Sequence, residues 1–150
     1  MSIIKRGERC PTCGRYVSRD LVTSGLVIKS GKILLVNRNI EPCRGMWSLI
    51  GGYIGWDETV EDCAKREVKE EVGLECEIIN FLGIYSGPNR DTHDLQNIGL
   101  AYVLKPVSEK ILIQKEEVME AKWFTFDNLP TPLAFDHAKI IEDYKKSLHS

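Results

Sequence analysis

The chain has 150 residues, of which 43% are hydrophobic and 28% are charged, and its formal net charge is -2. A chain of this length and composition can bury a sizeable core as one ordinary globular domain. The slightly acidic balance argues against a protein that binds a nucleic acid polymer through a broad basic surface, because such binding depends on an excess of Lys and Arg. A small charged ligand stays compatible with this composition.

The start of the chain, MSIIKRGERC, has charges but no long apolar run after them. A membrane-spanning helix needs about 18 or more consecutive apolar residues, and no such run occurs in this sequence. We therefore expect neither a signal peptide nor a membrane span, and we expect a soluble cytoplasmic protein. We divide the chain into an N-terminal segment, residues 1–20, and one domain, residues 21–150.

The five cysteines form an odd set without an obvious disulfide framework, so reduced thiols are expected. Cys10 and Cys13, in CPTCG, resemble one knuckle of a zinc ribbon. A closed structural zinc site needs four ligands, and no second CxxC follows in the chain. The pattern favours a turn with two free thiols. The alternative is a zinc ion completed by Cys43, a histidine or a second chain.

The first half of the chain predicts a hairpin, a loop and a helix. Two apolar runs, 26–28 and 33–36, flank the Gly-containing turn KSGK, which predicts a β-hairpin. A loop with a short strand near residues 47–49 follows. The sequence DETVEDCAKREVKEEVGL predicts the principal helix, with Asp57 or Thr59 as its N-cap and Gly73 as its end.

The second half predicts three strands and a closing helix. CEIINFLGIYS and IGLAYVLKP are apolar strands on either side of the polar stretch GPNRDTHDLQN, in which we expect His93 to be a solvated loop histidine. AKWFTF predicts the last strand, and a Pro-bounded turn separates it from a helix over about residues 135–148. In that helix Ala138, Ile141 and Tyr144 recur at helical spacing, which predicts a buried face.

Three glutamates lie in the last turns of the principal helix, where the helix dipole disfavours negative charge. Glu67 and Glu71 fall within the apolar stripe, and Glu70 lies at its edge. Mutual repulsion and burial both penalise the charged carboxylates. Arg66 and Lys69 are expected toward the other side of the helix, so we do not expect one cation to serve all three acids. A divalent cation such as Mg²⁺ would offset the repulsion, whereas a solvated acidic face without a ligand is the alternative.

A longer spacing surrounds these acids. Gly52 is followed by five residues, Glu58, seven residues and then REVKEEVGL. This arrangement resembles the signature of the Nudix hydrolase family, G-x5-E-x7-R-E-U-x-E-E-x-G-U with U aliphatic, and every fixed position is filled. The order of strands and helices is also similar to that family from about residue 20 onward. The resemblance implies an α/β protein with the Nudix fold, an α/β/α sandwich around a mixed β-sheet.

The resemblance also implies a metal site. It assigns Mg²⁺ or Mn²⁺ to Glu67, Glu70 and Glu71, with the Gly52 carbonyl as a further ligand. In this family pattern Arg66 would orient a neighbouring glutamate, and Glu58 would lie at the junction of loop and helix near the metals.

The identity of the general base stays open, because family members differ in the glutamate that they use. Glu71 and Glu67 are the first candidates, and Glu117 or Glu120, in QKEEVMEAKWF, is the remote alternative. For these last two residues an ordinary solvated acidic loop is the competing interpretation.

The implied activity is hydrolysis of a nucleoside diphosphate linked to another moiety, and the leading substrate is an ADP-linked compound such as ADP-ribose or NADH. The alternatives are a house-cleaning nucleoside triphosphate pyrophosphohydrolase and a non-catalytic nucleotide sensor. Trp47, Tyr53 and Tyr85 are candidates for stacking on a base, and Arg90 for binding a phosphate, although most aromatic residues of such a domain lie in the core. Relatives of this size are commonly homodimers, which leaves a homodimer open beside a monomer.

Overall fold

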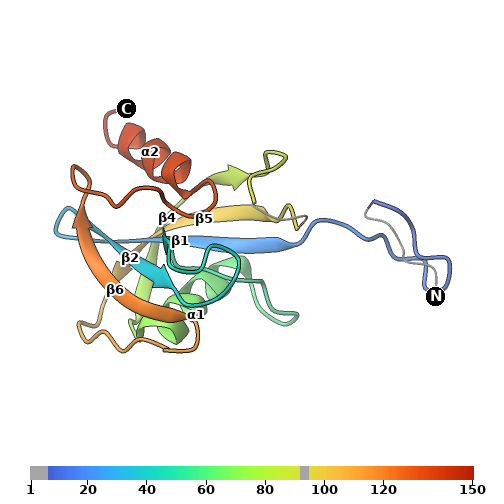
Figure 1. The fold of residues 1–150 in the computed structure, drawn as a ribbon, viewed down its shortest axis with the longest axis horizontal. Helices are drawn as coiled ribbons and strands as arrows, with labels where there is room; N and C mark the ends of the chain where they lie inside the picture. The colour runs from blue at the N-terminus through green and yellow to red at the C-terminus, as the bar shows by residue number, and fades with distance from the viewer. Residues whose placement is uncertain (1–6, 92–94) are drawn as a thin grey trace.

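The computed structural model describes residues 7–91 and 95–150 (Figure 1). His93 and residues 1–6 of the predicted N-terminal segment lie outside the described residues. The elements are β1 (Leu21–Lys29), β2 (Lys32–Arg38), β3 (Trp47–Ser48), α1 (Val60–Val72), β4 (Cys76–Tyr85), β5 (Ile98–Pro106), β6 (Val118–Thr125) and α2 (His137–Ser147).

The strands form one mixed sheet in the order β3-β2-β1-β5-β4, and β6 also pairs with β2. β1 and β5 run parallel, whereas the other strand pairs are antiparallel. β1 and β2 form the predicted hairpin, and both turn residues, Ser30 and Gly31, have positive φ angles of 50° and 72°. Two positive φ values are typical of the turn whose twist matches that of the flanking strands.

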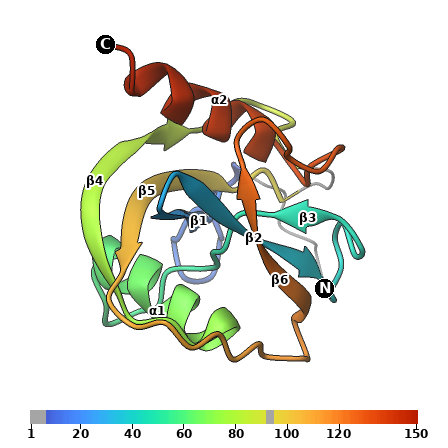
Figure 2. The same ribbon diagram turned by 90° about the vertical axis from the view of Figure 1, so that its left-hand side faces the viewer.

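The sheet lies between the two helices, so the predicted α/β/α sandwich is confirmed (Figure 2). Successive side chains of a strand point to opposite faces of a sheet. Accordingly, Val27 and Leu34 pack in the core with Val68 of α1, while the neighbouring Leu26 and Leu35 belong to the core that includes α2. The burial of apolar side chains on both faces is what holds the three layers together.

Helix α1 has the predicted ends. The Thr59 side chain accepts a hydrogen bond from the Asp62 N–H at 3.1 Å, so Thr59 is the N-cap. Gly73 adopts the left-handed conformation, φ 76°, and its N–H donates to the Lys69 carbonyl at 2.9 Å. Glu67 and Glu71 are buried together with the apolar stripe, as the helical spacing predicted.

Two predictions about the second half are wrong in detail. Helix α2 begins at His137, and its buried residues are His137, Ile140, Ile141 and Tyr144, so Ala138 is exposed instead of buried. The strand predicted as AKWFTF begins earlier, at Val118, because pairing with β2 continues past an irregularity in the register. Within the described ranges, no helix is long and apolar enough to cross a membrane.

Candidate functional site

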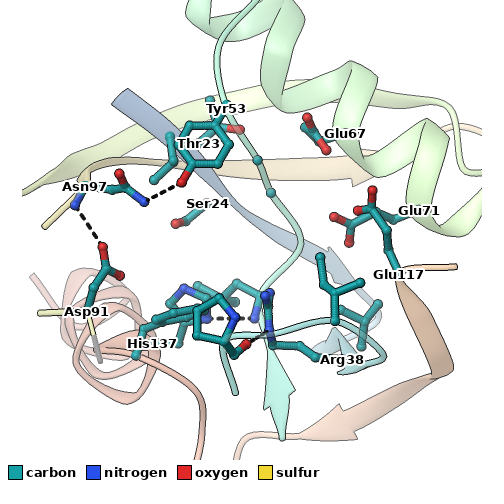
Figure 3. A pocket seen from close by; sticks show the side chains of 18 of the residues that line it. Thr23, Ser24, Arg38, Tyr53, Glu67, Glu71, Asp91, Asn97, Glu117 and His137 are labelled. Atoms are coloured by element: carbon teal, nitrogen blue, oxygen red, sulfur yellow. Dashed lines mark hydrogen bonds between the residues drawn. The ribbon is translucent and has the colours of Figure 1, made fainter. Parts of the chain in front are cut away.

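A cavity of about 550 Å³ opens between β1, β2, the segment 49–53, α1 and residues 90, 91, 95 and 97. Its lining includes both polar and apolar residues, and Figure 3 shows the polar ones converging from separate elements. Glu67 and Glu71 come from α1, and Glu117 comes from the residue before β6. Arg38 comes from the end of β2, and Asn97 from the residue before β5.

Two glycines let the segment 50–52 lie close to its neighbours, Gly51 against β1 and Gly52 against Glu67 of α1. A Cβ at Gly51 would lie 1.8 Å from the Thr23 carbonyl oxygen, and a Cβ at Gly52 would lie 2.5 Å from Glu67 Oε1. At Gly51 the neighbour is backbone, so only glycine allows this approach, whereas a side chain at Gly52 would displace the Glu67 carboxylate. The Thr23 N–H donates to the Gly52 carbonyl at 2.9 Å, so the carbonyl predicted as a metal ligand already accepts a backbone hydrogen bond.

Arg66 contacts three carboxylates, which corrects the expectation that it points away from the acids. Its Nε and Nη2 donate to the two Glu58 carboxylate oxygens at 2.8 and 2.7 Å. Its Nη1 donates to Glu67 at 2.9 Å and to Glu70 at 3.0 Å. The helical wheel placed only the Cα of Arg66. The long side chain extends toward the N-terminus of α1, as side chains of helices do, and reaches Glu58 there.

Glu58 lies at the junction of loop and helix, as predicted. Its carboxylate also accepts the Gly55 N–H at 2.6 Å. The Arg66 guanidinium, followed by this N–H, lowers the pKa of Glu58 to about 2. Glu58 is therefore ionised at neutral pH, and its hydrogen bonds fix both the loop and the Arg66 side chain.

Glu71 has a different environment. Its relative exposure is 7%, and its carboxylate makes no hydrogen bond or ion pair with any residue in 7–91 or 95–150. Burial raises the pKa of Glu71 well above its ordinary value, and the charges of Glu67 and Glu117 raise it further, while Arg38 opposes the shift. Burial also raises the pKa of Glu67, although Arg66 opposes this effect. Figure 3 shows Glu67, Glu71 and Glu117 on one side of the cavity.

The chemistry of these side chains fits a hard divalent cation. Buried carboxylates that repel each other offer the oxygen ligands that Mg²⁺ prefers. In the part of the chain that the structure describes, no group of three or more His, Cys, Asp or Glu side chains is arranged closely enough to hold a metal ion. Glu70, a predicted ligand, lines the cavity but is ion-paired with Arg66.

Besides Glu58, which bonds Arg66 outside the cavity lining, three predicted site residues do not line the cavity. Trp47 packs edge to face against Phe124, with ring centroids 5.0 Å apart, in the core that faces α2. The Tyr85 hydroxyl donates to Asp143 of α2 at 2.9 Å. Glu120 is ion-paired with Lys122 at 3.2 Å. The structure therefore places none of these three residues where the sequence analysis expected them to act.

Arg90 and Tyr53 do line the cavity. The Arg90 guanidinium is buried and donates to both carboxylate oxygens of Asp136, at 3.0 and 2.7 Å, and to the Asn97 carbonyl at 2.9 Å. These contacts correct the expectation that Arg90 is available for a phosphate, and they make it a link between Asn97 and the start of α2. Tyr53 is half exposed, and its hydroxyl contacts the Asn97 side chain at 3.1 Å.

Sequence reasoning missed Arg38, Asn97, Phe135 and His137, all of which line the cavity. Arg38 lies over the Phe135 ring, with its guanidinium carbon 5.0 Å from the ring centroid. His137 Nδ1 accepts the Leu49 N–H at 3.0 Å, and burial lowers the pKa of His137 to about 3, so this histidine is neutral. Only Arg38 had a signal in the sequence, as a charged residue at the end of an apolar strand.

The N-terminal cysteine pair lies apart from the cavity lining. Cys10 Sγ accepts the Cys13 N–H at 3.5 Å, and this bond closes the predicted turn. Hydrogen bonds from the backbone N–H groups of residues 12 and 13 lower the pKa of the Cys10 thiol.

Comparisons with known proteins agree with the geometry. The NUDIX domain family model matches residues 19–144. An ADP-ribose pyrophosphatase of Methanocaldococcus jannaschii is 38% identical over 131 residues, which cover 87% of this chain and 76% of that protein. A NAD-capped RNA hydrolase, NudC, of Pseudomonas aeruginosa is 33% identical, covering 84% of this chain and 44% of that protein. The crystal structure of a NUDIX hydrolase from Nitrosomonas europaea has a TM-score of 0.81 at 25% identity, covering 94% of this chain and 79% of that chain. The chain belongs to the Nudix hydrolase family.

Proposed function

We propose that this chain hydrolyses the pyrophosphate linkage of an ADP-linked compound of the ADP-ribose class, with Mg²⁺ or Mn²⁺ as cofactor. The observation that carries the proposal is the buried Glu71 carboxylate, which faces the charges of Glu67 and Glu117 without a cation partner among the described residues. An uncompensated buried charge of this kind destabilises a folded protein unless a ligand completes it. A divalent cation bound with a pyrophosphate is a ligand of the required charge and chemistry.

Glu67, Glu71 and Glu117 would hold the cation, and Glu70 would join them if it left Arg66. The bound cation would neutralise the charge of the pyrophosphate and lower the pKa of a bound water. The chain's own residues then have separate tasks. Arg66 fixes the Glu67 carboxylate through the hydrogen bond at 2.9 Å. Glu71, which has no such partner in the described chain, is our candidate to accept the proton of the attacking water.

The choice of substrate rests on size, charge and the relatives. A cavity of about 550 Å³ is within the range of small-molecule sites. The formal net charge of -2 does not favour a nucleic acid polymer. The Methanocaldococcus jannaschii relative that bears the name ADP-ribose pyrophosphatase is matched over 76% of its length. The chain spans less than half of the Pseudomonas aeruginosa NudC, at 44%, so we do not carry the capped-RNA substrate of that protein over to this chain.

The experiment is a panel of substrates incubated with the protein and Mg²⁺ or Mn²⁺. Release of AMP from ADP-ribose or NADH supports the proposal. Release of pyrophosphate from nucleoside triphosphates instead would favour the house-cleaning alternative, and nucleotide binding without any turnover would favour a sensor. The Glu71→Gln variant, assayed in parallel, shows whether the turnover belongs to this site and not to a contaminating phosphatase.

We also propose that residues 21–150 form the catalytic domain and that the protein works in the cytoplasm. The NUDIX match over residues 19–144 supports this domain. The buried thiols of Cys63 and Cys76 are free, which suits a reducing compartment. The oligomeric state, a monomer or the homodimer that is common among relatives, is measured directly by light scattering.

A further inference from the structure

Two side chains face each other on the wall of the cavity across from Glu71 and Glu117 (Figure 3). Tyr53 follows the glycine pair, and its backbone forms a bridge with Val22 of β1. Asn97 precedes β5, which pairs with β1 in parallel. The Asn97 side-chain Nδ2 donates to the Tyr53 hydroxyl at 3.1 Å. The two side chains are therefore held by segments that both pair with β1.

The direction of this hydrogen bond decides which further hydrogen bond the Tyr53 hydroxyl can make. An amide nitrogen of asparagine only donates, so the Tyr53 oxygen is the acceptor and its own hydrogen stays available. The Asn97 backbone is itself fixed, because its N–H donates to Asp91 at 2.8 Å and its carbonyl accepts from Arg90 at 2.9 Å. Asn97 thus holds the Tyr53 hydroxyl as a donor toward a ligand.

Stability alone does not explain an asparagine at this position. Asn97 is only 7% exposed, and its side-chain Oδ1 has no hydrogen-bond partner among the described residues. A buried acceptor without a partner destabilises a fold, so an apolar residue of similar size would suit the fold better. The donor function toward Tyr53 is the property that an apolar residue would lose.

The surroundings of this pair suit a nucleobase. Tyr53 is 49% exposed and presents its ring as well as its hydroxyl, and Val22 and Leu95 add apolar surface to the same lining. An adenine base combines flat apolar faces with ring nitrogens that accept hydrogen bonds. The pyrophosphate would lie at the acidic wall, so the base of the same substrate would extend to the opposite one. This assignment rests on the proposed function, since it takes an ADP-linked compound as the ligand.

We infer that Asn97 is a positioning residue that orients the Tyr53 hydroxyl to donate a hydrogen bond to a ring nitrogen of the substrate's adenine base. The probe that tests this is adenosine, which is uncharged and needs neither a metal ion nor hydrolysis to bind. Its affinity is measured by calorimetric titration for the wild type, Tyr53→Phe, Asn97→Leu and the double variant. Tyr16→Phe, which removes an exposed tyrosine hydroxyl outside the cavity lining, is the matched control.

Tyr53→Phe keeps the ring, and loss of one neutral hydrogen bond should weaken adenosine binding about three- to tenfold. Asn97→Leu should also weaken it, and the double variant should bind no more weakly than Tyr53→Phe, because both changes remove the same interaction. Tyr16→Phe should bind as the wild type does. In addition, one of 1-deaza-, 3-deaza- and 7-deazaadenosine should bind the wild type more weakly than adenosine, and this difference should vanish in Tyr53→Phe.

The inference is overturned if the wild type shows no saturable adenosine binding, or if Tyr53→Phe binds adenosine as the wild type does. It is equally overturned if all three deaza analogues match adenosine, or if Asn97→Leu lowers the melting temperature without changing the affinity, which is the result of a purely structural role. Failure of the proposed function would instead show as an absence of AMP release from ADP-ribose. The two failures are therefore read from separate measurements.

Discussion

Replacing Glu71 by Gln should stabilise the metal-free protein while it removes turnover. The side chain is 7% exposed, and its carboxylate has no partner in the described part of the chain. Glutamine keeps nearly the same shape and removes the charge. The variant therefore relieves the repulsion by Glu67 and Glu117, two of the charges that raise the pKa of Glu71. Most substitutions of a buried residue destabilise a protein, so the expected sign is unusual.

The size of the effect follows from the burial. A buried charged group without a partner costs at least about 1–3 kcal/mol. The increase in the free energy of unfolding stays below the full cost of the buried charge for two reasons. The raised pKa of Glu71 lets the carboxyl take up a proton, and the amide of the variant is also buried. We expect a gain of about 1–2 kcal/mol, which for a chain of 150 residues corresponds to a rise in melting temperature of about 2–8 °C.

The assay is thermal unfolding in EDTA and again with Mg²⁺ and AMP. Glu116→Gln, which changes an exposed glutamate outside the cavity lining, is the control and should leave both melting temperatures unchanged. The ligands should raise the melting temperature of the wild type more than that of Glu71→Gln, because the variant has lost a proposed ligand. A variant that melts at or below the wild-type temperature in EDTA, or that gains as much from the ligands, would refute the reasoning.

Three further predictions concern neighbours of the acids. Gly52→Ala should lower the rate of ADP-ribose hydrolysis, because its Cβ would lie 2.5 Å from the Glu67 carboxylate and would displace that side chain, whereas Gly87→Ala, with open space around it, should keep the wild-type rate. Arg66→Lys should lower kcat/KM at least about tenfold, since an ammonium does not replace the bidentate contact of the guanidinium with Glu58. Steady-state rates equal to those of the wild type would contradict this role. His137→Asn should remove an acid-dependent loss of stability. Burial lowers the pKa of His137 from 6.5 to about 3, so its contribution to stability is complete above pH 6.5 and falls by about 1.4 kcal/mol per pH unit below it. The free energy of unfolding is measured with urea at pH 7, 6 and 5, and the same dependence on pH in the variant and the wild type would argue against this assignment.

Local patterns in the sequence predicted the elements whose ends depend on a few neighbouring residues. Thr59 and Gly73 cap α1 as expected, because capping involves residues only three or four positions away. The hairpin was equally local. Helix α2 was placed two residues too early, and its face was predicted through Ala138 because that residue fits the apolar spacing. The true face begins with His137, a polar residue whose burial depends on a bond to Leu49, 88 positions away.

The same distinction explains which site residues were found. The acids of α1 share one helix, so their spacing alone predicted the cluster. Asn97 and Tyr53 are 44 positions apart, and Arg90 and Asp136 are 46 apart, with no periodic pattern to relate them. Such pairs depend on how the sheet and loops assemble, and a single sequence carries no record of that assembly.

The charges of the site are the physical basis of the proposed cation, even though Arg66 contacts several acids. Arg66 contacts the carboxylates of Glu58, Glu67 and Glu70, so these acids share one fixed positive charge. Glu71 makes no contact with Arg66, and the positive charge that lowers its pKa is that of Arg38. Arg38 itself donates a hydrogen bond to the Pro42 carbonyl at 2.8 Å and lies over the Phe135 ring. Among the described residues, neither Glu71 nor Glu117 therefore forms an ion pair with a cationic side chain. These acids would repel a phosphate group, so under the proposed function a pyrophosphate substrate would reach them only together with divalent cations.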